Sequence, residues 1–364
     1  MFDLNQIVRP NIARLKPYSS ARSEFEGEAE IFLDANENAF GSPAGPGYNR
    51  YPDPLQRELK ERIAAMRDVR PENIFIGNGS DEAIDLLFRI FCEPGRDECL
   101  ICPPTYGMYR VSADINDVAV KEVPLRKDYS LDAEGVLGSL SEQTKIVFVC
   151  SPNNPTGNVM DREVIMRIAQ NFGGIVVVDE AYAEFTNAQS LVPSIASHPN
   201  IVVLRTFSKA WGMAGLRVGM AFADDAIIEL VNRVKPPYNV SGIAQRAVLE
   251  ALRSNEQVDQ WVEQAISERE RLSEELSRLS VVERVFPSDA NFLLVKTSDA
   301  AGIYKELIRT GIVVRDRSRV LLCKGCLRIT VGTPEENDRL LESLRSIGTG
   351  MSTGEVLPIL LGGI

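Results

Sequence analysis

Short hydrophobic runs alternate with amphipathic stretches from about residue 73 onward. The first of these runs is residues 73–77. Three later runs are continuous and rich in β-branched side chains, which is typical of strands buried on both faces of a parallel sheet: residues 145–150, 174–179 and 201–205. Hydrophobic residues at helical spacing occupy residues 54–66, 80–91 and 161–171. The pattern predicts an α/β fold with a mostly parallel central sheet and helices on both of its faces.

The pattern changes after residue 241. A long charged stretch with helical spacing predicts a connecting helix, and it is followed by predicted strands at 281–282, 291–296, 311–315 and 326–331 and by predicted helices at 302–309 and from Pro334. These segments predict a small α+β domain. We therefore divide the chain into an N-terminal arm or small-domain segment (1–40), a large domain (41–280), a small domain (281–347) and a tail without function (348–364).

Length and charge narrow the class of function. A chain of 364 residues has room for about two domains. Its 40 Lys and Arg against 51 Asp and Glu give a net charge of −11, which repels nucleic acid and anionic membranes, so we expect neither as a partner. The sequence has neither a signal-peptide pattern nor a stretch apolar enough to span a bilayer, which predicts a cytoplasmic protein.

The histidine and cysteine positions point away from metal sites and from histidine-based catalysis. The single histidine, His198, lies in a Ser-His-Pro-Asn turn that is typical of a protein surface. Cys99 and Cys102 lie in a predicted strand, where residues three apart face opposite sides, while Cys323 and Cys326 span a turn. We expect reduced, mostly buried thiols and no metal site. Catalysis must then use Lys, Tyr, Asp or a cofactor.

Lys209 follows the predicted strand at 201–205, in the segment Thr-Phe-Ser-Lys-Ala-Trp-Gly. A lysine that is poorly solvated at such a place has a lowered pKa, and its free amine can form a Schiff base. Ser208 beside it and Arg217 eight residues later can bind a phosphate, the arginine through a bidentate fork. Taken alone, the segment is equally compatible with a lysine on a surface turn.

Asp179 ends the hydrophobic run Val-Val-Val-Asp, and Tyr182 follows three residues later. A buried, ionised carboxylate needs a cationic partner, and a protonated pyridine nitrogen is one such partner. The phenol of Tyr182 can hydrogen-bond an oxygen on the same ring. The alternative is an aspartate that caps the next turn.

Two further turns follow predicted strands. The segment Ser-Pro-Asn-Asn-Pro-Thr-Gly at 151–157 is a stiff turn that fixes the direction of Asn154, although a generic turn would have the same composition. Ser80 begins a predicted helix whose N-terminal N–H groups favour an anion, although it can also be a simple cap. Together these segments supply a phosphate site, a carboxylate, a phenol and an amine at strand ends, the set that pyridoxal phosphate requires.

The motifs around Asn154, Asp179, Lys209 and Arg217, in this order and at this spacing, resemble the fold-type I aminotransferases. Within that fold type the chain is more specifically similar to the histidinol-phosphate aminotransferase subfamily. The similar segments extend over nearly the whole chain: Leu-Asp-Ala-Asn-Glu-Asn at 33–38, Arg-Tyr-Pro-Asp-Pro at 50–54, Gly-Ser-Asp-Glu at 79–82, Pro-Pro-Thr-Tyr at 103–106 and Gly-Cys-Leu-Arg-Ile-Thr-Val-Gly-Thr at 325–333. Ala39 departs from the subfamily, which usually has Pro there.

The resemblance implies a role for each candidate residue. Lys209 would form the Schiff base with pyridoxal phosphate and Asp179 would keep its ring nitrogen protonated. Tyr182 and Asn154 would hydrogen-bond the ring oxygen. Tyr106 would stack on the ring. The cofactor phosphate would be bound by the backbone N–H groups of Ser80, Asp81 and Glu82, by Ser208 and Arg217 and, from the neighbouring subunit of a homodimer, by Tyr51.

The resemblance also implies a ping-pong reaction in which histidinol phosphate becomes imidazole acetol phosphate while 2-oxoglutarate becomes glutamate, in histidine biosynthesis. One site must then accept both a carboxylate and a phosphate monoester. Forked guanidiniums suit both anions, and the candidates for the substrate site are Arg315, Arg328, Tyr18 and Asn36.

Other readings remain open at this point. A pyridoxal-phosphate decarboxylase of threonine phosphate would share the lysine, the aspartate and the arginines, because the orientation of the bond that breaks is not visible in a sequence. An aromatic or broad-range aminotransferase is a further alternative. A ligand sensor without turnover belongs to a different class, and the presence of both Lys209 and Asp179 argues against it.

Overall fold

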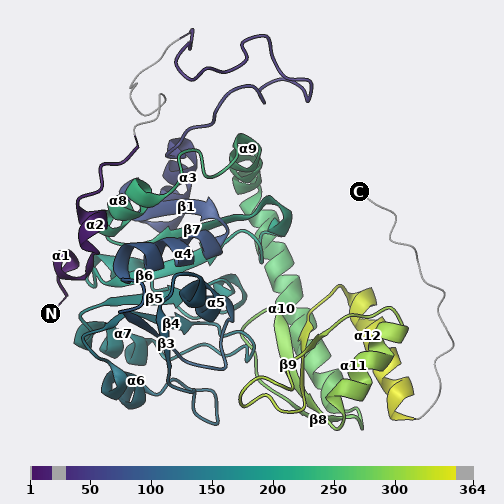
Figure 1. Ribbon diagram of the computed structural model, residues 1–364. Helices are drawn as coiled ribbons and strands as arrows, with labels where there is room; N and C mark the ends of the chain where they lie inside the picture. The colour runs from purple at the N-terminus through teal and green to yellow at the C-terminus, as the bar shows by residue number, and fades with distance from the viewer. Residues whose placement is uncertain (1, 19–29, 350–364) are drawn as a thin grey trace.

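The computed structural model describes residues 2–18 and 30–349 and consists of a larger and a smaller part joined by the long helix α10 (Asn255–Ser277), as Figure 1 shows. The joining helix is the one predicted from the charged stretch after residue 241. The tail predicted at 348–364 lies outside the described residues from position 350 onward, as do residues 19–29 of the predicted arm.

The larger part is built on a seven-stranded sheet with the order β1-β7-β6-β5-β4-β2-β3. Its strands are β1 (Ile74–Asn78), β2 (Glu98–Ile101), β3 (Ala119–Glu122), β4 (Thr144–Cys150), β5 (Ile175–Asp179), β6 (Ile201–Thr206) and β7 (Val218–Phe222). Neighbouring strands from β3 to β6 pair in parallel, and β7 pairs antiparallel with both β6 and β1. The predicted mostly parallel sheet is therefore confirmed.

Helices cover both faces of this sheet because its central strands β4, β5 and β6 are buried and hydrophobic on both. One core contains residues of α3 (Arg57–Arg67), α6 (Ala133–Ser139), α7 (Arg162–Asn171) and α9 (Gly242–Ala251). The other contains residues of α4 (Ser80–Phe91), α5 (Met108–Ile115) and α8 (Asp225–Val234). Cys99 belongs to one core and Cys102 to the other, which confirms that they face opposite sides. All six cysteines are buried.

The described part of the N-terminal arm packs on the larger part. Val8, between its helices α1 (Leu4–Ile7) and α2 (Pro10–Ala13), and Ile12 of α2 are buried in the core shared with α4 and α8. Arg9 donates a hydrogen bond to the carbonyl of Arg89 at 2.9 Å and forms an ion pair with Glu93 at 3.1 Å. Residues 2–13 are therefore part of the larger unit's surface layer.

The smaller part has an antiparallel sheet with the order β10-β11-β9-β8. Its strands are β8 (Val282–Val285), β9 (Phe292–Thr297), β10 (Arg315–Asp316) and β11 (Cys326–Thr330), and α10, α11 (Ala300–Arg309) and α12 (Pro334–Gly348) share its core. The α+β character predicted for this region is confirmed.

The strand predicted at 311–315 is wrong except for its last residue. Gly311, with φ of +78°, donates its N–H to the carbonyl of Ile308, and Ile312 donates to the carbonyl of Leu307 at 2.8 Å. These bonds satisfy the end of α11, as a helix C-cap does. The hydrophobic residues that suggested a strand pack against the core instead, and pairing begins only at Arg315.

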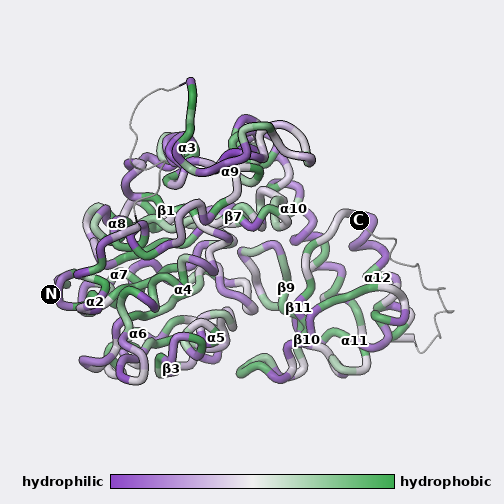
Figure 2. The backbone as a smooth tube through the Cα atoms, turned by 45° about the horizontal axis from the view of Figure 1, so that its top comes forward, coloured by the Kyte–Doolittle hydropathy of each residue, from purple (hydrophilic) through white to green (hydrophobic). Residues whose placement is uncertain are grey.

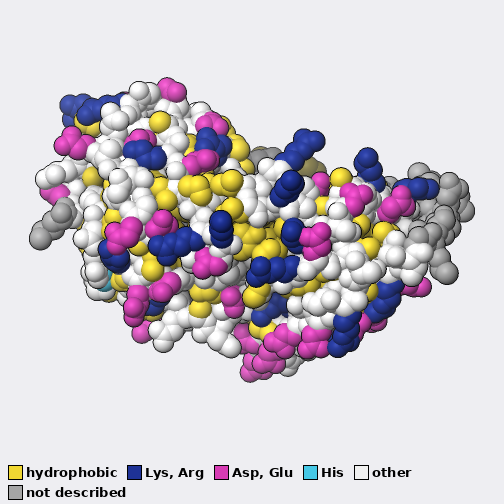
Figure 3. All heavy atoms as spheres, turned by 90° about the horizontal axis from the view of Figure 1, so that it is seen from below, with side chains coloured by type: hydrophobic (Ala, Val, Ile, Leu, Met, Phe, Trp, Pro, Cys, Tyr) yellow, Lys and Arg dark blue, Asp and Glu magenta, His cyan; other side chains and the backbone are white. Residues whose placement is uncertain are grey.

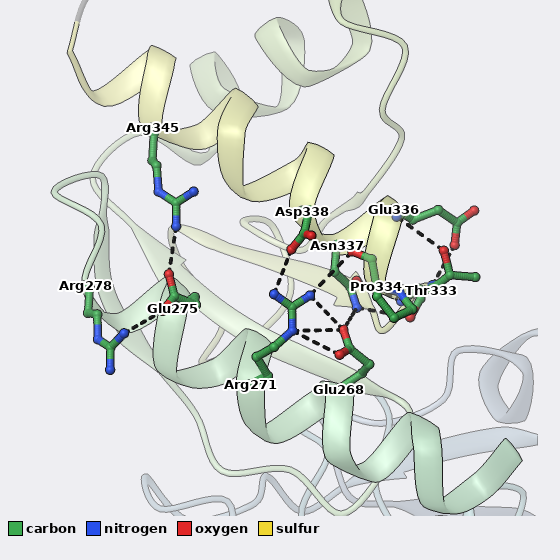
Figure 4. Close-up of polar contacts among 11 residues, drawn as sticks. Glu268, Arg271, Glu275, Arg278, Thr333, Pro334, Glu336, Asn337, Asp338 and Arg345 are labelled. Carbon is green, nitrogen blue, oxygen red and sulfur yellow. Dashed lines mark hydrogen bonds and ion pairs between the residues drawn. The ribbon is translucent and has the colours of Figure 1, made fainter. Parts of the chain in front are cut away.

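Polar contacts fix α12 to α10, as Figure 4 shows. Arg271 on α10 forms ion pairs with Glu268 at 2.8 Å and with Asp338 of α12 at 2.7 Å. The buried Asn337 donates to Glu268 at 2.9 Å. A capping box between Thr333 and Glu336 begins α12. The smaller sheet is thereby held on the helix that leads to it from the larger part.

Hydropathy and charge follow this arrangement. Hydrophobic segments, green in Figure 2, run along the inner strands, and hydrophilic segments are frequent on the outer helices and loops. Acidic and basic side chains are interspersed over the face shown in Figure 3. Among the described helices, none combines the length and the hydrophobicity that crossing a bilayer requires.

Candidate active site

A cavity of about 920 Å³ lies where β4, β5 and β6 end and α4 begins, and residues of the smaller part form its other wall. Ligand sites in open α/β sheets are expected at these carboxyl ends. Most of the predicted site residues line this cavity: Ser80, Asp81, Tyr106, Asn154, Asp179, Tyr182, Ser208, Lys209, Arg217, Arg315 and Arg328.

Lys209 lies in a compact turn after β6. Phe207 donates its N–H to Val218 and accepts from Met213 through its carbonyl, and its ring packs edge-on against Trp211 at 5.3 Å. This turn leaves the Lys209 side chain facing the cavity, with its Nζ 5.5 Å from the centroid of the Tyr182 ring. Loss of solvation lowers the pKa of Lys209, and the positive charge of Arg328 lowers it further.

Asp179 is the last residue of β5 and is almost fully buried. Its Oδ2 accepts a hydrogen bond from the hydroxyl of Tyr109 at 2.8 Å, and its Oδ1 accepts from the N–H of Ala181 at 3.1 Å. Burial raises the pKa of Asp179 to about 6, although both hydrogen bonds act in the opposite direction. A nearby cation would therefore stabilise its charged form.

Tyr109 was not among the site residues predicted from the sequence. Its ring stacks on Phe148 at 4.6 Å and packs edge-on against Tyr106 at 5.5 Å. Its complete burial looks like ordinary core packing, but its hydroxyl reaches Asp179. A sequence signal did exist, because Tyr109 follows Tyr106 by three residues at the start of α5, where side chains share a helix face.

One end of the cavity is suited to a phosphate. Ser80 begins α4, and N–H groups in the first turn of a helix have no partner within it. Gly79, with φ of +72°, donates its N–H to the carbonyl of Arg217 at 2.7 Å. At Gly219 a Cβ would lie 2.2 Å from the backbone nitrogen of Ser80, so only glycine permits this close approach. The helix start and Arg217 are thereby held at the same end of the cavity.

Two further predicted residues in the cavity, Tyr106 and Asn154, are held by polar contacts. The hydroxyl of Tyr106 donates to Asp81 at 3.1 Å, and Arg217 forms an ion pair with the same carboxylate at 3.3 Å. Asn154, which is buried, accepts a hydrogen bond from Arg328 at 2.5 Å through its Oδ1. The cofactor and substrate candidates are therefore directly connected across the two parts of the chain.

Four predicted site residues lie outside the cavity. The carboxylate of Glu82 accepts hydrogen bonds from the N–H of Asn78 at 2.6 Å and from Asn239 at 3.0 Å, away from the cavity wall. Asn36 and Tyr51 line a second cavity of about 490 Å³, in which Tyr51 stacks on Tyr238 at 4.5 Å. Tyr18 is 76% exposed and lines neither of these two cavities.

Comparison with known proteins agrees with this geometry. Residues 28–344 match the model of the family "Aminotransferase class I and II". Proteins of Cytophaga hutchinsonii and Parabacteroides distasonis, both named histidinol-phosphate aminotransferase, are 52% and 51% identical to the chain over 95% of its length and 99% of theirs. The solved histidinol-phosphate aminotransferase of Sinorhizobium meliloti, in complex with pyridoxal-5'-phosphate, has a TM-score of 0.78 at 26% identity and covers 87% of this chain and 90% of its own.

Proposed function

The chain belongs to the class I and II aminotransferases, and we propose that it transfers the amino group of L-histidinol phosphate to 2-oxoglutarate, which yields imidazole acetol phosphate and glutamate. The observation that carries this proposal is that one cavity joins Lys209 and Asp179 to the arginine pair Arg315 and Arg328. Relatives that share about half of their residues with the chain bear the corresponding name.

The cavity fits the cofactor of this family, pyridoxal phosphate. Asp179 is a buried carboxylate whose charged form needs a cation, which a protonated ring nitrogen supplies. The start of α4 forms a cradle that a Cβ at Gly219 would fill. We assign the cofactor phosphate to Ser208, Arg217 and the first turn of α4, that is, to Ser80 and the backbone N–H groups of Asp81 and Glu82.

Each of the chain's own groups then has a distinct task. When bound, pyridoxal phosphate supplies an aldehyde that links to amino groups and a ring that withdraws electrons. Lys209, whose pKa is lowered by loss of solvation, would hold the cofactor covalently and, when free, would move a proton at the substrate's Cα. Asp179 would keep the proton on the ring nitrogen. Tyr182 and Asn154, which line the same cavity, would hydrogen-bond the ring oxygen, and Tyr106 would pack on the ring.

Arg315 and Arg328 orient the substrates. The two residues are direct partners on β10 and β11, so both guanidiniums are on one side of the small sheet. A guanidinium can bind a carboxylate or a phosphate through two parallel hydrogen bonds. The same pair can therefore receive 2-oxoglutarate in one half-reaction and histidinol phosphate in the other.

We infer that the active unit is a homodimer in which Tyr51 reaches the cofactor phosphate of the neighbouring subunit. The segment around Tyr51 exposes an unusual number of large hydrophobic side chains, which favours a protein interface: Ile31, Leu33, Phe40, Tyr48 and Tyr51. Asn36 lines the same second cavity as Tyr51, so the same subunit interface would place Asn36 near the substrate of the neighbouring subunit. Tyr18 remains a predicted substrate contact. Sedimentation of the active enzyme should give twice the chain mass of 40.2 kDa. An active monomer would contradict the shared site.

The substrate assignment is tested by comparing reactions of the purified holoenzyme. We expect glutamate to form from histidinol phosphate and 2-oxoglutarate, with a higher kcat/KM than for phenylalanine or tyrosine as amino donor. Carbon dioxide release from threonine phosphate would instead identify a decarboxylase, and a higher kcat/KM for the aromatic donors would identify a broad-range aminotransferase. A protein that binds these compounds without turnover would be a ligand sensor.

A further inference from the structure

Arg317 and Arg319 line the active cavity together with Arg315 and Arg328, and the sequence analysis did not predict a role for them. Arg315, Arg317 and Arg319 occupy alternate positions in the segment Arg-Asp-Arg-Ser-Arg at 315–319. Arg317 donates its N–H to the carbonyl of Cys326, which continues the strand pairing of β10 past its last residue. Side chains alternate along such a backbone, so Arg315 and Arg317 are on the same side.

The described residues provide no ion pair for Arg315, Arg317, Arg319 or Arg328. By contrast, Arg110, which lines the same cavity, is paired with Glu122 at 2.6 Å. The nearest acidic residue in sequence, Asp316, accepts a hydrogen bond from the N–H of Ser318 at 2.8 Å. The cavity wall therefore carries a group of cationic side chains whose charge the described protein does not neutralise through ion pairs.

This arrangement is costly without an anion. Arg315 lies directly opposite Arg328 across the strand pair, and like charges in that position destabilise a sheet. The Nε atoms of Arg317 and Arg328 are buried and lack hydrogen-bond partners among the described residues. Burial, followed by the charges of Arg328 and Arg315, lowers the pKa of Arg317. These costs would be offset by an anion that receives several N–H donors at once.

The number of guanidiniums distinguishes between anions. A carboxylate carries one negative charge and offers two oxygens, which a bidentate pair satisfies. A phosphate monoester carries a charge of about −1.5 to −2 and offers three strong acceptor oxygens, so a third guanidinium gains more from it than from a carboxylate. The local cation excess is also needed because the net charge of −11 repels anions from the molecule as a whole.

We propose that Arg317 is a specificity-determining residue that, beside Arg315 and Arg328, makes the substrate end of the cavity select phosphate monoesters over carboxylates. Arg319, which is exposed at the same wall, adds to the local positive field. This inference rests on the proposed transamination and names the group of the substrate that Arg317 recognises.

The test uses the holoenzyme, in which the cofactor occupies its own phosphate site, and inorganic phosphate and acetate as competitive inhibitors. We expect Arg317→Gln to weaken inhibition by phosphate at least about tenfold, equivalent to 1.4 kcal/mol, while inhibition by acetate changes less than about threefold. The KM for histidinol phosphate should rise with little change in kcat. Arg317→Lys keeps the charge without the fork and should fall between the wild type and Arg317→Gln.

The matched control is Arg309→Gln, which removes one positive charge from the same part of the chain at an exposed arginine paired with Glu306. It should leave both inhibition constants unchanged. The inference would be overturned if Arg317→Gln weakened inhibition by phosphate and by acetate equally. It would also be overturned if the inhibition constant for phosphate were unchanged in both Arg317→Gln and Arg317→Lys. Either result would leave the transaminase proposal intact. If the wild type does not transaminate histidinol phosphate but Arg317→Gln still loses phosphate affinity, only the transaminase proposal fails.

Discussion

Replacing Lys209 with alanine should reduce kcat for glutamate formation by about 10⁴-fold or more, because in the proposed mechanism the same amine binds the cofactor and moves the proton at the substrate's Cα. The enzyme should still fold, since the Lys209 side chain faces the cavity and the turn that holds it is built by Phe207 and Trp211. Steady-state formation of glutamate and the visible absorbance of the loaded enzyme report the two functions separately.

Lys60 provides the matched control for this change. It is a buried lysine whose pKa is lowered to about 8, chiefly by burial, but it lies on α3 and lines a separate cavity. Lys60→Met keeps the aliphatic packing and should retain activity and absorbance. The role assigned to Lys209 would be refuted if Lys209→Ala kept a tenth of the wild-type kcat, or if both variants lost activity alike.

The second large effect is expected at Asp179. Asp179→Asn preserves the size of the side chain but removes the negative charge that, in the proposed mechanism, keeps the cofactor's ring nitrogen protonated. We expect kcat to fall by about 10²–10³-fold, the scale seen when one preorganised electrostatic contact is removed from an active site. Asp97→Asn is the control, because Asp97 is also buried but accepts its hydrogen bond from the N–H of Glu93, outside the cavity. Equal losses in the two variants would point to stability rather than catalysis.

Tyr109→Phe provides a graded form of the same test. The hydroxyl of Tyr109 lowers the pKa of Asp179, so its removal should raise that pKa and keep the carboxyl protonated to a higher pH. The acidic limb of the pH profile of kcat/KM should therefore move to higher pH, with a small effect in alkaline buffer. Tyr129→Phe, which removes a hydroxyl bonded to the carbonyl of Leu322, should leave the limb in place. If the acidic limb of the pH profile did not move in Tyr109→Phe, the Tyr109 hydroxyl would have no influence on the pKa of Asp179.

The sequence predicts the central strands β4, β5 and β6 well because they are buried on both faces and therefore consist of uninterrupted hydrophobic runs. The strands β3 and β7 were not predicted, and β3 has no buried residue. Asp179 and Lys209 could be identified for the same reason. Each polar residue stands at or just after the carboxyl end of such a hydrophobic run, and these strand ends lie side by side in a parallel sheet. The strand predicted at 311–315 failed because its hydrophobic residues close a helix end and pack in the core. Hydrophobicity alone does not separate these cases.

Other parts of the site depend on contacts between distant segments. Tyr109 reads as a core residue until its hydroxyl is placed beside Asp179, seventy positions later in the chain. The importance of Arg317 appears only when β10 is paired with β11, which brings Arg315 opposite Arg328. Tyr51 and Asn36 lie away from the chain's own cavity, so a role for them requires a second subunit, whose placement no local pattern encodes.

The most direct measurement is borohydride reduction of the yellow holoenzyme followed by peptide mass mapping. Borohydride reduces a carbon–nitrogen double bond between a lysine and the cofactor and so makes the link permanent. The phosphopyridoxyl mass should then appear on the peptide that contains residue 209, in an amount close to one per chain. Label on a different lysine, such as Lys60, or no label in a protein that transaminates, would contradict the central assignment.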